Sequence, residues 1–227
     1  MNIRSVSSNF QYFVDTVLSC HMKFDVLGFT ETRLDGDISP LYTLPEYQMF
    51  TTNRNRYDGG VAIYASSKYE CTKVKVYYLL EMHIESLGIE AKRDDKVFFL
   101  YICIYRPPQS NIKDFYESLT EILTFINDKS YHAIFLFGDF NLDLLQQNDN
   151  IQEFINLMYN YSLFPLTTLP IRIIPTSATL IDHIWSSLVE HNLANYIIKT
   201  DVTDHYPVLS ILNVTNPHNP NLHILQK

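Results

Sequence analysis

The sequence predicts an α/β protein whose sheets are mixed or antiparallel. Strand-like and helix-like patterns are interleaved along the 227 residues, and such interleaving is typical of α/β domains. Several strand-like segments also follow one another between residues 47 and 105, which favours pairing between sequence neighbours. Hydrophobic residues make up 46% of the chain and charged residues 19%, as in globular rather than disordered proteins.

Eight segments are predicted to form strands. Several of them are continuously apolar, as expected for strands that are covered on both faces. Others alternate, such as the segment in which Val61, Ile63 and Ala65 fall on one side. In chain order, the eight segments are 24–29, 60–65, 71–78, 83–91, 96–105, 133–138, 180–185 and 206–212.

Three segments are predicted to form helices. The clearest spans residues 111–128, in which apolar residues recur at steps of three and four. Residues 8–22 and 151–161 have the same kind of pattern. No Gly/Ser-rich or Pro-rich linker divides the chain, so residues 1–214 are predicted to form one domain. Residues 215–227 are polar and are predicted to form a tail or a linker.

The charge balance of the chain argues against strong non-specific binding to nucleic acid. Seventeen Lys and Arg stand against 25 Asp and Glu, which gives a formal net charge of −8. Nucleic-acid-binding domains commonly carry an excess of basic residues instead. The sequence shows no heptad repeat and no additional long amphipathic segment that could form an interface, so a monomer is expected.

The hydrophobic segments and the cysteines indicate an intracellular protein that is not secreted. The longest apolar run, residues 97–105, is too short to cross a bilayer, and the N-terminal residues lack the apolar core of a signal peptide. No membrane partner is therefore expected. Cys20, Cys71 and Cys103 are widely spaced among apolar neighbours, so we expect buried, reduced thiols and no cysteine-based metal site.

Polar residues stand where several of the predicted strands end. Rigid strands aim such side chains into one crevice, which is where α/β proteins place their sites. Taken singly, an acid after a strand is more often a turn or a helix cap than a ligand. The residues in question are Glu31, Tyr105, Arg106, Asp139, Asn141, Asp182, Asp204 and His205.

Asp182 is the hardest of these residues to explain as a turn residue. It lies within an apolar run, and a buried aspartate must be paired. Its neighbour His183 would point to the opposite face of the strand and is interpreted as a packed or surface histidine.

Considered jointly, these residues favour a Mg²⁺ site. Carboxylates and amides are the oxygen ligands that Mg²⁺ accepts together with water and phosphate oxygens, whereas zinc prefers nitrogen and sulfur. Metal-assisted attack of water on a phosphodiester needs a cation, a base for the water and a polar group that faces the leaving oxygen. All of these parts are present among the strand-end residues.

The strand-end residues lie in an ordered series of motifs that resembles the endonuclease/exonuclease/phosphatase superfamily. The resemblance is greatest to the apurinic-type endonuclease domain of non-long-terminal-repeat (non-LTR) retrotransposon polyproteins, and it runs from Asn2 to about Leu212. It implies a DNase I-like fold, a four-layer sandwich of two mixed β-sheets flanked by helices. The motifs are NIRS (2–5), ETRL (31–34), IYRPP (104–108), GDFNLDL (138–144), SATLIDHIW (177–185) and TDHYPVLS (203–210).

The resemblance implies metal ligands and a partner for the water. Glu31 would be the principal ligand of Mg²⁺, or of Mn²⁺ in its place, with Asn2 beside it and Asp204 completing an acidic cluster. Asp139 would orient or deprotonate the attacking water, and Asn141 would hold water or a phosphate oxygen.

The resemblance also implies residues that would contact the substrate. Tyr105 and His205 would bind the scissile phosphate, and Asp182 would pair with His205 and raise its pKa. Further substrate contacts would come from Arg106, Arg172, Thr179 and Thr203.

The sequence departs from the family pattern in three places. The family's Asn ends an interior first strand, but here it is residue 2, so the first strand is expected to be truncated. Ile171 replaces a Thr near bound DNA, and Thr203 replaces a Ser with retention of the hydroxyl. Arg4 stands where repair enzymes carry an acid, which favours the retrotransposon branch.

Three functions follow as hypotheses. The first is a Mg²⁺-dependent endonuclease that nicks one strand of double-stranded DNA and leaves 3′-hydroxyl and 5′-phosphate ends. In the retrotransposon setting it would act in the nucleus, prime reverse transcription, and work beside a reverse transcriptase domain of a parent polyprotein. The second is a phosphatase or phosphodiesterase for another phosphate ester. The third is a truncated, inactive remnant that acts as a binding module.

Overall fold

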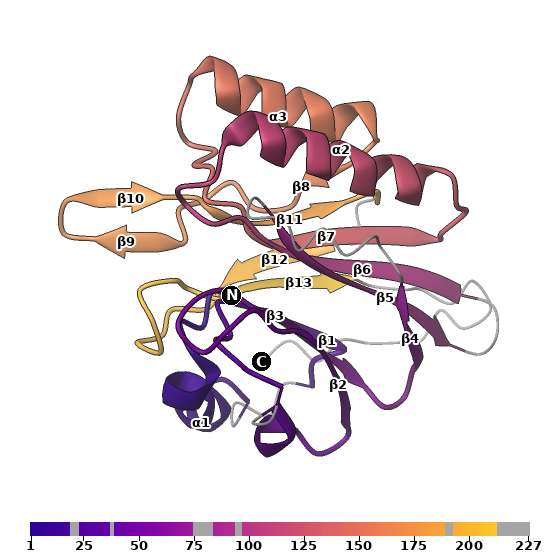
Figure 1. The fold of residues 1–227 in the computed structure, drawn as a ribbon, viewed down its shortest axis with the longest axis vertical. Helices are drawn as coiled ribbons and strands as arrows, with labels where there is room; N and C mark the ends of the chain where they lie inside the picture. Colours follow the sequence, from indigo (N-terminus) through magenta and orange to yellow (C-terminus); the bar gives the residue numbers. More distant parts are fainter. Residues whose placement is uncertain (19–22, 37–38, 75–83, 94–96, 189–192, 213–227) are drawn as a thin grey trace.

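The largest sheet in the described part of the chain has six strands and forms one of two central layers (Figure 1). The structure is a computed structural model that describes residues 1–18, 23–36, 39–74, 84–93, 97–188 and 193–212. The sheet is mixed, because β6 and β7 pair in parallel and the other neighbours pair antiparallel. Its strands, in spatial order, are β4 (Glu70–Val74), β5 (Glu85–Arg93), β6 (Val97–Tyr105), β7 (Ala133–Asp139), β11 (Asp182–Ser186) and β8 (Phe164–Pro165).

Two helices cover the outer face of this sheet, α2 (Ile112–Asn127) and α3 (Asp149–Asn160). Each helix begins at an asparagine cap, since the side chain of Asn111 accepts a hydrogen bond from the backbone of Lys113 and that of Asn148 accepts one from Ile151. Their apolar faces pack on the sheet in the largest core cluster, around the fully buried Trp185.

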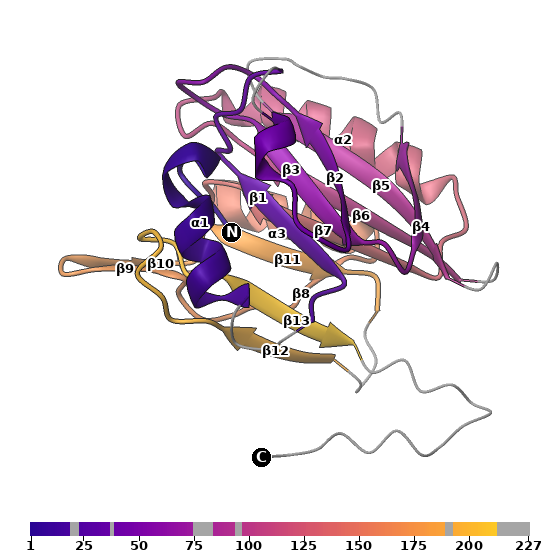
Figure 2. The same cartoon turned by 90° about the horizontal axis from the view of Figure 1, so that it is seen from below.

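The second central layer consists of two separate pieces that lie over the same face of the six-stranded sheet (Figure 2). One piece has the order β1 (Val26–Thr30), β3 (Val61–Ser66), β2 (Tyr47–Thr52), and the other pairs β12 (Leu193–Ile197) with β13 (Val208–Leu212). Helix α1 (Val6–Thr16) covers the outside of β1 and β3, so four layers result. The remaining elements are η2 (Ser39–Tyr42) and the hairpin of β9 (Arg172–Ile174) and β10 (Ser177–Thr179).

The predicted α/β sandwich with mixed sheets and outer helices is therefore confirmed. Helix α1 begins before the predicted 8–22 segment and ends at Thr16, while residues 19–22 lie outside the described part. Strand β4 covers the start of the predicted segment 71–78, and residues 75–83 are likewise outside it. The tail 215–227 and Cys20 also lie outside the described residues.

The cysteine prediction is confirmed for Cys103 and wrong for Cys71. Cys103 is fully buried between the layers. Cys71 is only half-buried, because β4 is the edge strand of its sheet and most of its side chains face solvent. Among the described residues, no helix is both long and apolar enough to cross a membrane.

Residues 1–3 stand where the sequence predicts the end of a first strand. Asn2 forms a single parallel bridge with Thr30 at the end of β1. The backbone N–H of Ile3 donates to the carbonyl of Thr30 at 3.0 Å, and the N–H of Thr30 donates to the carbonyl of Met1 at 3.1 Å. This bridge places Asn2 in the buried interior.

Candidate active site

The register of the six-stranded sheet aligns four polar residues across four neighbouring strands. Glu85 on β5 is opposite Tyr105 on β6, Tyr105 is opposite Asp139 on β7, and Asp139 is opposite Asp182 on β11. Residues directly opposite each other in a sheet share a face, so the four side chains form a row. Each is at most 3% exposed. The strand ends thus create a buried polar row in an apolar sheet.

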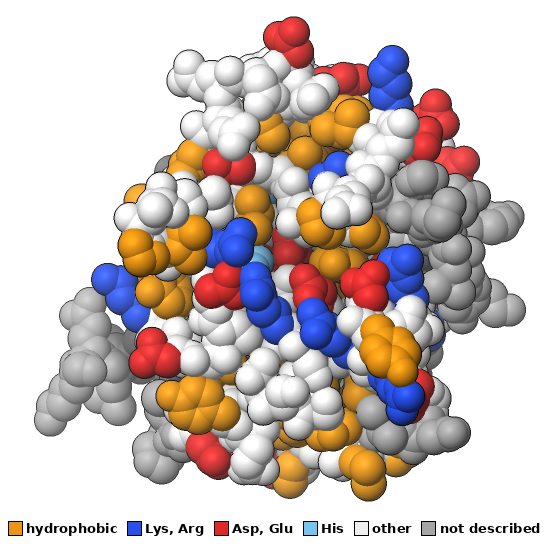
Figure 3. Space-filling model, turned by 60° about the vertical axis from the view of Figure 1, so that its left-hand side comes forward, with side chains coloured by type: hydrophobic (Ala, Val, Ile, Leu, Met, Phe, Trp, Pro, Cys, Tyr) orange, Lys and Arg blue, Asp and Glu red, His pale blue; other side chains and the backbone are white. Residues whose placement is uncertain are grey.

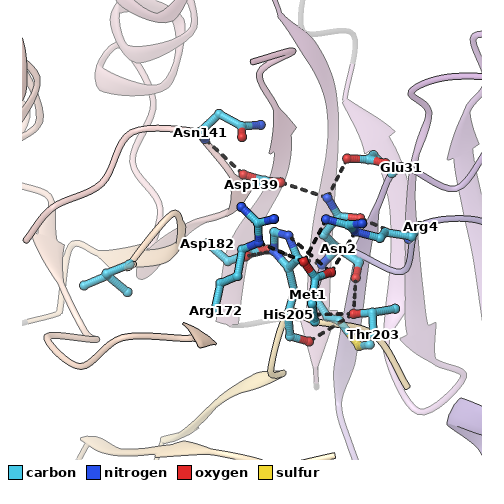
Figure 4. A network of polar contacts seen from close by, with 12 residues as sticks. Met1, Asn2, Arg4, Glu31, Asp139, Asn141, Arg172, Asp182, Thr203 and His205 are labelled. Carbon is cyan, nitrogen blue, oxygen red and sulfur yellow. Dashed lines mark hydrogen bonds and ion pairs between the residues drawn. The ribbon is translucent and has the colours of Figure 1, made fainter. Parts of the chain in front are cut away.

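His205 joins this row through Asp182 (Figure 4). Its ring Nδ1 is 2.6 Å from Asp182 Oδ2, and both residues are buried. Burial alone lowers the pKa of His205, but the Asp182 carboxylate outweighs it, so the pKa is raised above the ordinary value. Burial acts to raise the pKa of Asp182, and the charge and hydrogen bond of His205 overcome this and lower it. The two residues therefore form a buried ion pair in which Nε2 of the ring remains available.

The pKa of Asp139 is shifted in the opposite direction to that of Asp182. Burial, followed by the neighbouring Asp182 carboxylate, raises the pKa of Asp139 to about 7, although His205 and the hydrogen bonds to Asp139 act against the shift. Its carboxylate accepts the backbone N–H of Asn141 at 3.0 Å and the side-chain amide of Asn2 at 2.9 Å. The pKa values of Asp139 and Asp182, two opposed carboxyl groups, are thus shifted in opposite directions. Such a pair can provide one carboxylate that accepts a proton near neutral pH and one that stays charged.

The amide of Asn2 connects Asp139 to Glu31. Its Nδ2 donates to Glu31 Oε1 at 2.7 Å and to Asp139 Oδ2 at 2.9 Å. Its Oδ1 accepts the backbone N–H of Arg4 at 3.0 Å, which fixes which end of the amide faces the carboxylates. Asn2 therefore acts here as a donor that holds two carboxylates together. Tyr105 also reaches Glu31 Oε1, with its hydroxyl at 3.5 Å.

The backbone is strained at several points around the site. Arg4, Glu31 and Asn141 have φ values of 50°, 52° and 48°, in the left-handed region that non-glycine residues avoid. Such conformations cost about 1–3 kcal/mol each and persist where the surroundings enforce them. Here the enforcing contacts are the hydrogen bonds of Asn2, Asp139 and neighbouring backbone, so the strain is concentrated where the polar side chains converge.

The donor set fits a divalent cation bound by oxygen. Glu31 and Asp139 both turn carboxylate oxygens toward the amide of Asn2, and the raised pKa of Asp139 reflects buried negative charge that a cation would offset. Asp139, Asp182 and His205 also offer ligand atoms that lie within 4.8 Å of one another. Because Nδ1 of His205 is already bonded to Asp182, the side facing Glu31 is better suited to hold the cation.

Asp204 lies on the other side of His205, among arginines. Its carboxylate is 2.8 Å from Nε of Arg4 and 2.8 Å from Nε of Arg172, and 4.0 Å from Nε2 of His205. Burial acts to raise the pKa of Asp204, and Arg172, together with His205 and Arg4, lowers it. Asp204 is thus paired with two arginine side chains in this structure, and it anchors both guanidinium groups beside the site.

Arginines border the acidic hollow. Arg33 pairs with Glu31 at 3.0 Å, while Arg4 and Arg172 pair with Asp204. The space-filling view shows acidic side chains and a histidine in a hollow with Lys and Arg side chains next to them (Figure 3). These partly exposed guanidinium groups can meet the phosphates of a substrate that reaches the carboxylates.

The other predicted substrate-binding residues have different surroundings. Arg106 is buried, and its guanidinium donates to the backbone carbonyls of Asn141 at 3.1 Å and Ser110 at 2.8 Å. The amide of Asn141 in turn donates to the carbonyl of Arg106 at 2.7 Å, so Arg106 positions the Asn141 turn. Thr203 accepts the N–H of His205 and donates to the carbonyl of Asn2, both at 3.1 Å. Thr179 lies in β10, and no described residue links its hydroxyl to the network.

His183 is a packed histidine, as its position on the strand predicts. It is buried on the opposite face of β11 and stacks on Phe140 with the ring centroids 4.9 Å apart. Its Nε2 lies 2.9 Å from the carbonyl of Leu180, and burial lowers its pKa to about 4. The ring is therefore neutral at neutral pH and takes no part in the site.

Glu85 is the residue of the polar row that the sequence interpretation missed. Its carboxylate accepts the backbone N–H of Gly60 and pairs with Arg54 at 2.9 Å, so it holds the loop before β3 next to Tyr105. Burial raises its pKa. A signal was present, because an acid that opens the alternating run HIESLGIEA falls in register with the end of the next strand.

Comparisons with known proteins agree with this geometry. Residues 2–205 match the Endonuclease/Exonuclease/phosphatase family. The search of curated proteins found no match. Solved structures with a similar fold include the endonuclease domain of TRAS1, a telomere-specific non-LTR retrotransposon, with a TM-score of 0.70 at 12% identity over 93% of this chain and 95% of that one.

Two further structures show the range of proteins that share the fold. The 3′-5′ exonuclease NExo from Neisseria meningitidis has a TM-score of 0.70 at 18% identity, with 93% of this chain and 97% of that one covered. The mannosyl-6-phosphatase Bt3783 of Bacteroides thetaiotaomicron has a TM-score of 0.59 at 16% identity, with 91% of each chain covered. The match to the family extends across nearly the whole chain and includes every residue of the polar network, so the protein belongs to the endonuclease/exonuclease/phosphatase family and is a hydrolytic enzyme.

Proposed function

We propose that the protein is a Mg²⁺-dependent DNA endonuclease that nicks one strand and leaves 3′-hydroxyl and 5′-phosphate ends. The observation that carries the proposal is the buried network in which Asp139, the Asp182–His205 pair and Glu31 converge at one end of the sandwich. A phosphodiesterase needs a base, a fixed positive group for the phosphate and a cation-binding acid within one site, and this network contains all three.

Glu31 is the proposed principal ligand of the cation, with Asp139 beside it and Asn2 holding the two carboxylates in place. Mg²⁺ prefers oxygen ligands and keeps several waters, and Mn²⁺ accepts the same donors. When bound, the cation would offset the negative charge that develops on the phosphate. Asp204 contributes indirectly, since it anchors Arg4 and Arg172 at the edge of the site.

Asp139 is the proposed base. A group whose pKa lies near the working pH is suited to take a proton from water, and burial beside Asp182 moves Asp139 in that direction. The backbone N–H of Asn141 fixes one carboxylate oxygen of Asp139, which leaves the other oxygen toward Asn2 and the substrate side. Water would then attack phosphorus and give its proton to Asp139, while the bond from phosphorus to the 3′ oxygen would break and that oxygen would take a proton from solvent to become the 3′-hydroxyl.

His205 and Tyr105 are the proposed contacts of the scissile phosphate. Asp182 bonds to Nδ1 of His205, which favours the charged form of the ring and leaves Nε2 to donate to a phosphate oxygen. Tyr105 is fixed by its place opposite Asp139 and by its contact with Glu31. Thr203 ties the backbone of His205 to that of Asn2, so the two sides of the site keep their spacing.

The proposed substrate is double-stranded DNA, held weakly by this domain alone. Arg4, Arg33 and Arg172 border the hollow, but two carboxylates already engage them, and the whole chain carries a net charge of −8. The motif resemblance and the fold shared with the TRAS1 endonuclease domain support a role in target-primed retrotransposition. That role implies action in the nucleus and a reverse transcriptase domain as a neighbour, with residues 1–214 as a monomeric nuclease domain.

Relaxation of supercoiled plasmid tests the proposal. We expect nicked circles with Mg²⁺ or Mn²⁺ and none with EDTA, and DNA ligase should reseal the nicks directly because the ends are 3′-hydroxyl and 5′-phosphate. Parallel samples would contain a phosphate monoester or a small phosphodiester instead of plasmid.

The outcomes separate the three hypotheses. Hydrolysis of small esters without any nicking would overturn the DNA assignment in favour of a phosphatase or phosphodiesterase. A folded protein that hydrolyses none of these substrates with either metal would be the inactive remnant. Nicks that ligase cannot reseal would contradict the proposed end chemistry.

A further inference from the structure

Arg33 forms an ion pair with the carboxylate that we propose as the principal cation ligand. Nη2 of Arg33 lies 3.0 Å from Oε2 of Glu31. The other carboxylate oxygen of Glu31, Oε1, accepts the side-chain amide of Asn2 at 2.7 Å. A cation that binds Glu31 therefore approaches an oxygen that already has a protein donor, and the two donors differ in charge.

The Asn2 amide can remain on Oε1 when a cation binds the same carboxylate. It is neutral, and a carboxylate has lone pairs for several partners. It is also held firmly, because Asn2 is 1% exposed, its Nδ2 donates to Asp139 at 2.9 Å as well, and its Oδ1 accepts the N–H of Arg4. The donor that a cation would replace is thus the guanidinium on Oε2.

The guanidinium of Arg33 is held less completely than those of the other two arginines beside the site. Its side chain is 35% exposed, and its buried Nε has no hydrogen-bond partner among the described residues. Arg4 meets Asp204 through both Nε and Nη2, at 2.8 and 2.9 Å, and Arg172 meets it through Nε at 2.8 Å. A buried donor without a partner is unfavourable, so the present position of Arg33 costs little to leave.

The backbone around Arg33 is fixed, which limits any change to its side chain. The N–H of Arg33 donates to the carbonyl of Gly59 at 2.8 Å, and that of Thr32 donates to the carbonyl of Gly60 at 3.1 Å. The carbonyl of Glu31 accepts the N–H of Ser5 at 2.9 Å. Rotation of the long Arg33 side chain can therefore move its guanidinium while Glu31 stays beside Asn2.

We propose that a divalent cation displaces Arg33 from Glu31 and that the freed guanidinium then binds a phosphate of the substrate. This inference rests on the proposed function, because it takes Glu31 as the cation ligand and DNA as the substrate. A guanidinium and a divalent cation on one oxygen repel each other, whereas a phosphate accepts the planar donor groups of an arginine.

The exchange couples the binding of the cation to the binding of DNA. While Arg33 is paired with Glu31, the two side chains neutralise each other. Once a divalent cation takes the place of Arg33, both the cation and the guanidinium present positive charge to the substrate. Each ligand therefore strengthens the binding of the other, since such coupling is reciprocal.

Binding of Mn²⁺ to the full chain without DNA tests the exchange. Electron paramagnetic resonance measures the free ion, so the affinity is obtained without any reaction. Arg33→Gln removes the competing ion pair and should bind Mn²⁺ at least about threefold more tightly than the wild type. Arg172→Gln is the matched control, because it removes the same charge from Asp204 instead of Glu31, and it should change the affinity by less than about twofold.

Binding of DNA tests the release of Arg33 to a phosphate. The probe is a random duplex with phosphorothioate linkages, which slow hydrolysis, and its fluorescence anisotropy is measured at constant ionic strength with Mg²⁺ or with EDTA. Arg33→Gln should weaken binding at least about threefold more with Mg²⁺ than with EDTA, because the wild-type guanidinium reaches the phosphate only when the cation is bound. Arg172→Gln should weaken binding by the same factor in both conditions.

Two results would overturn the proposal. One is an Mn²⁺ affinity of Arg33→Gln that equals that of the wild type or rises no more than that of Arg172→Gln. The other is a loss of DNA affinity in Arg33→Gln that is the same with Mg²⁺ and with EDTA. If the wild type nicks plasmid and either result is found, only this inference fails. If Arg33→Gln binds Mn²⁺ more tightly but the wild type nicks no plasmid, the exchange at Glu31 is supported and the proposed function fails.

Discussion

The two central layers contribute to the site in different ways. The six-stranded sheet supplies Tyr105, Asp139 and Asp182 from neighbouring strands in one register. The split layer supplies Glu31 and His205 from residues just outside β1 and β13, and these are held by side-chain bonds. The proposed base is thus fixed by a continuous ladder, whereas the proposed cation ligand and the proposed phosphate contact lie just outside strands of the split layer. The two sides of the site are therefore held by different means, strand register on one side and side-chain hydrogen bonds on the other.

The largest expected effect separates the two buried histidines. His205→Phe removes the ring that pairs with Asp182 and should lower the nicking rate by about 10²–10³-fold, the usual cost of losing one donor to the charge that develops in the transition state. His183→Phe keeps the stack on Phe140, and the carbonyl of Leu180 keeps the N–H of Leu144 as a partner, so activity should stay within a few fold. The measurement is single-turnover nicking of plasmid by the two variants. Similar losses in both would contradict the assignment of His205.

A second comparison concerns packing in the two layers. Leu136→Ala, in the fully buried core under α2 and α3, should reduce the free energy of unfolding by about 2–5 kcal/mol. Leu27→Ala should cost less, because Leu27 already borders a cavity and loses fewer neighbours. Urea denaturation of both variants measures the difference. An equal or larger loss for Leu27→Ala would contradict the looser packing around Leu27.

The buried ion pair predicts a pH dependence of stability. The raised pKa of His205 gives stabilisation that is complete below its unfolded value of about 6.5 and is lost as pH rises through the folded value. The lowered pKa of Asp182 gives stabilisation that is present above its unfolded value of about 3.9 and is lost as pH falls through the folded value.

Asp182→Asn removes both contributions. We expect the pKa of His205 to fall in this variant, because burial then acts on the ring without the main opposing charge. NMR titration of the His205 ring and urea denaturation across pH would measure the two consequences. An unchanged His205 pKa would show that the pair is not formed in solution.

The smallest expected effect is the dependence of DNA binding on salt concentration. Only a few arginines border the hollow, so about three phosphate contacts should form, and the logarithm of the DNA-binding constant should fall with log salt at a slope near −3. Fluorescence anisotropy with random duplex at several salt concentrations measures the slope. A slope near −8 with nanomolar affinity would contradict weak binding by this domain.

The sequence predicts those site residues whose positions are set by the ends of strands. Asp139 and Asp182 stand at the ends of apolar runs, and adjacent strand ends place them opposite each other. Glu85 escapes notice because its partners, Gly60 and Arg54, come from a loop 25 and 31 residues away along the chain, and local patterns do not reveal such contacts. The orientation of Asn2 depends on the backbone N–H of Arg4 and also requires the folded chain.

The fold is predictable where elements are long. Periodic or apolar runs identify α2, α3 and most strands of the six-stranded sheet, whereas β8, β9 and β10 have two or three residues each and carry no periodic signal. β2 and β12 also fall outside the predicted segments. The bridge of Asn2 to Thr30 indicates where a first strand would lie, but the division of the layer into two pieces follows only from pairing between distant segments.

The nicking rate of Asp139→Asn beside that of Asp128→Asn is the most direct test of the proposed site. Both substitutions replace one carboxylate with an amide, but Asp139 is buried at the centre of the network and Asp128 is exposed at the end of α2. We predict that Asp139→Asn lowers Mg²⁺-dependent nicking by about 10²–10⁴-fold with a retained fold, and that Asp128→Asn leaves it unchanged. Equal nicking by both variants would contradict the account.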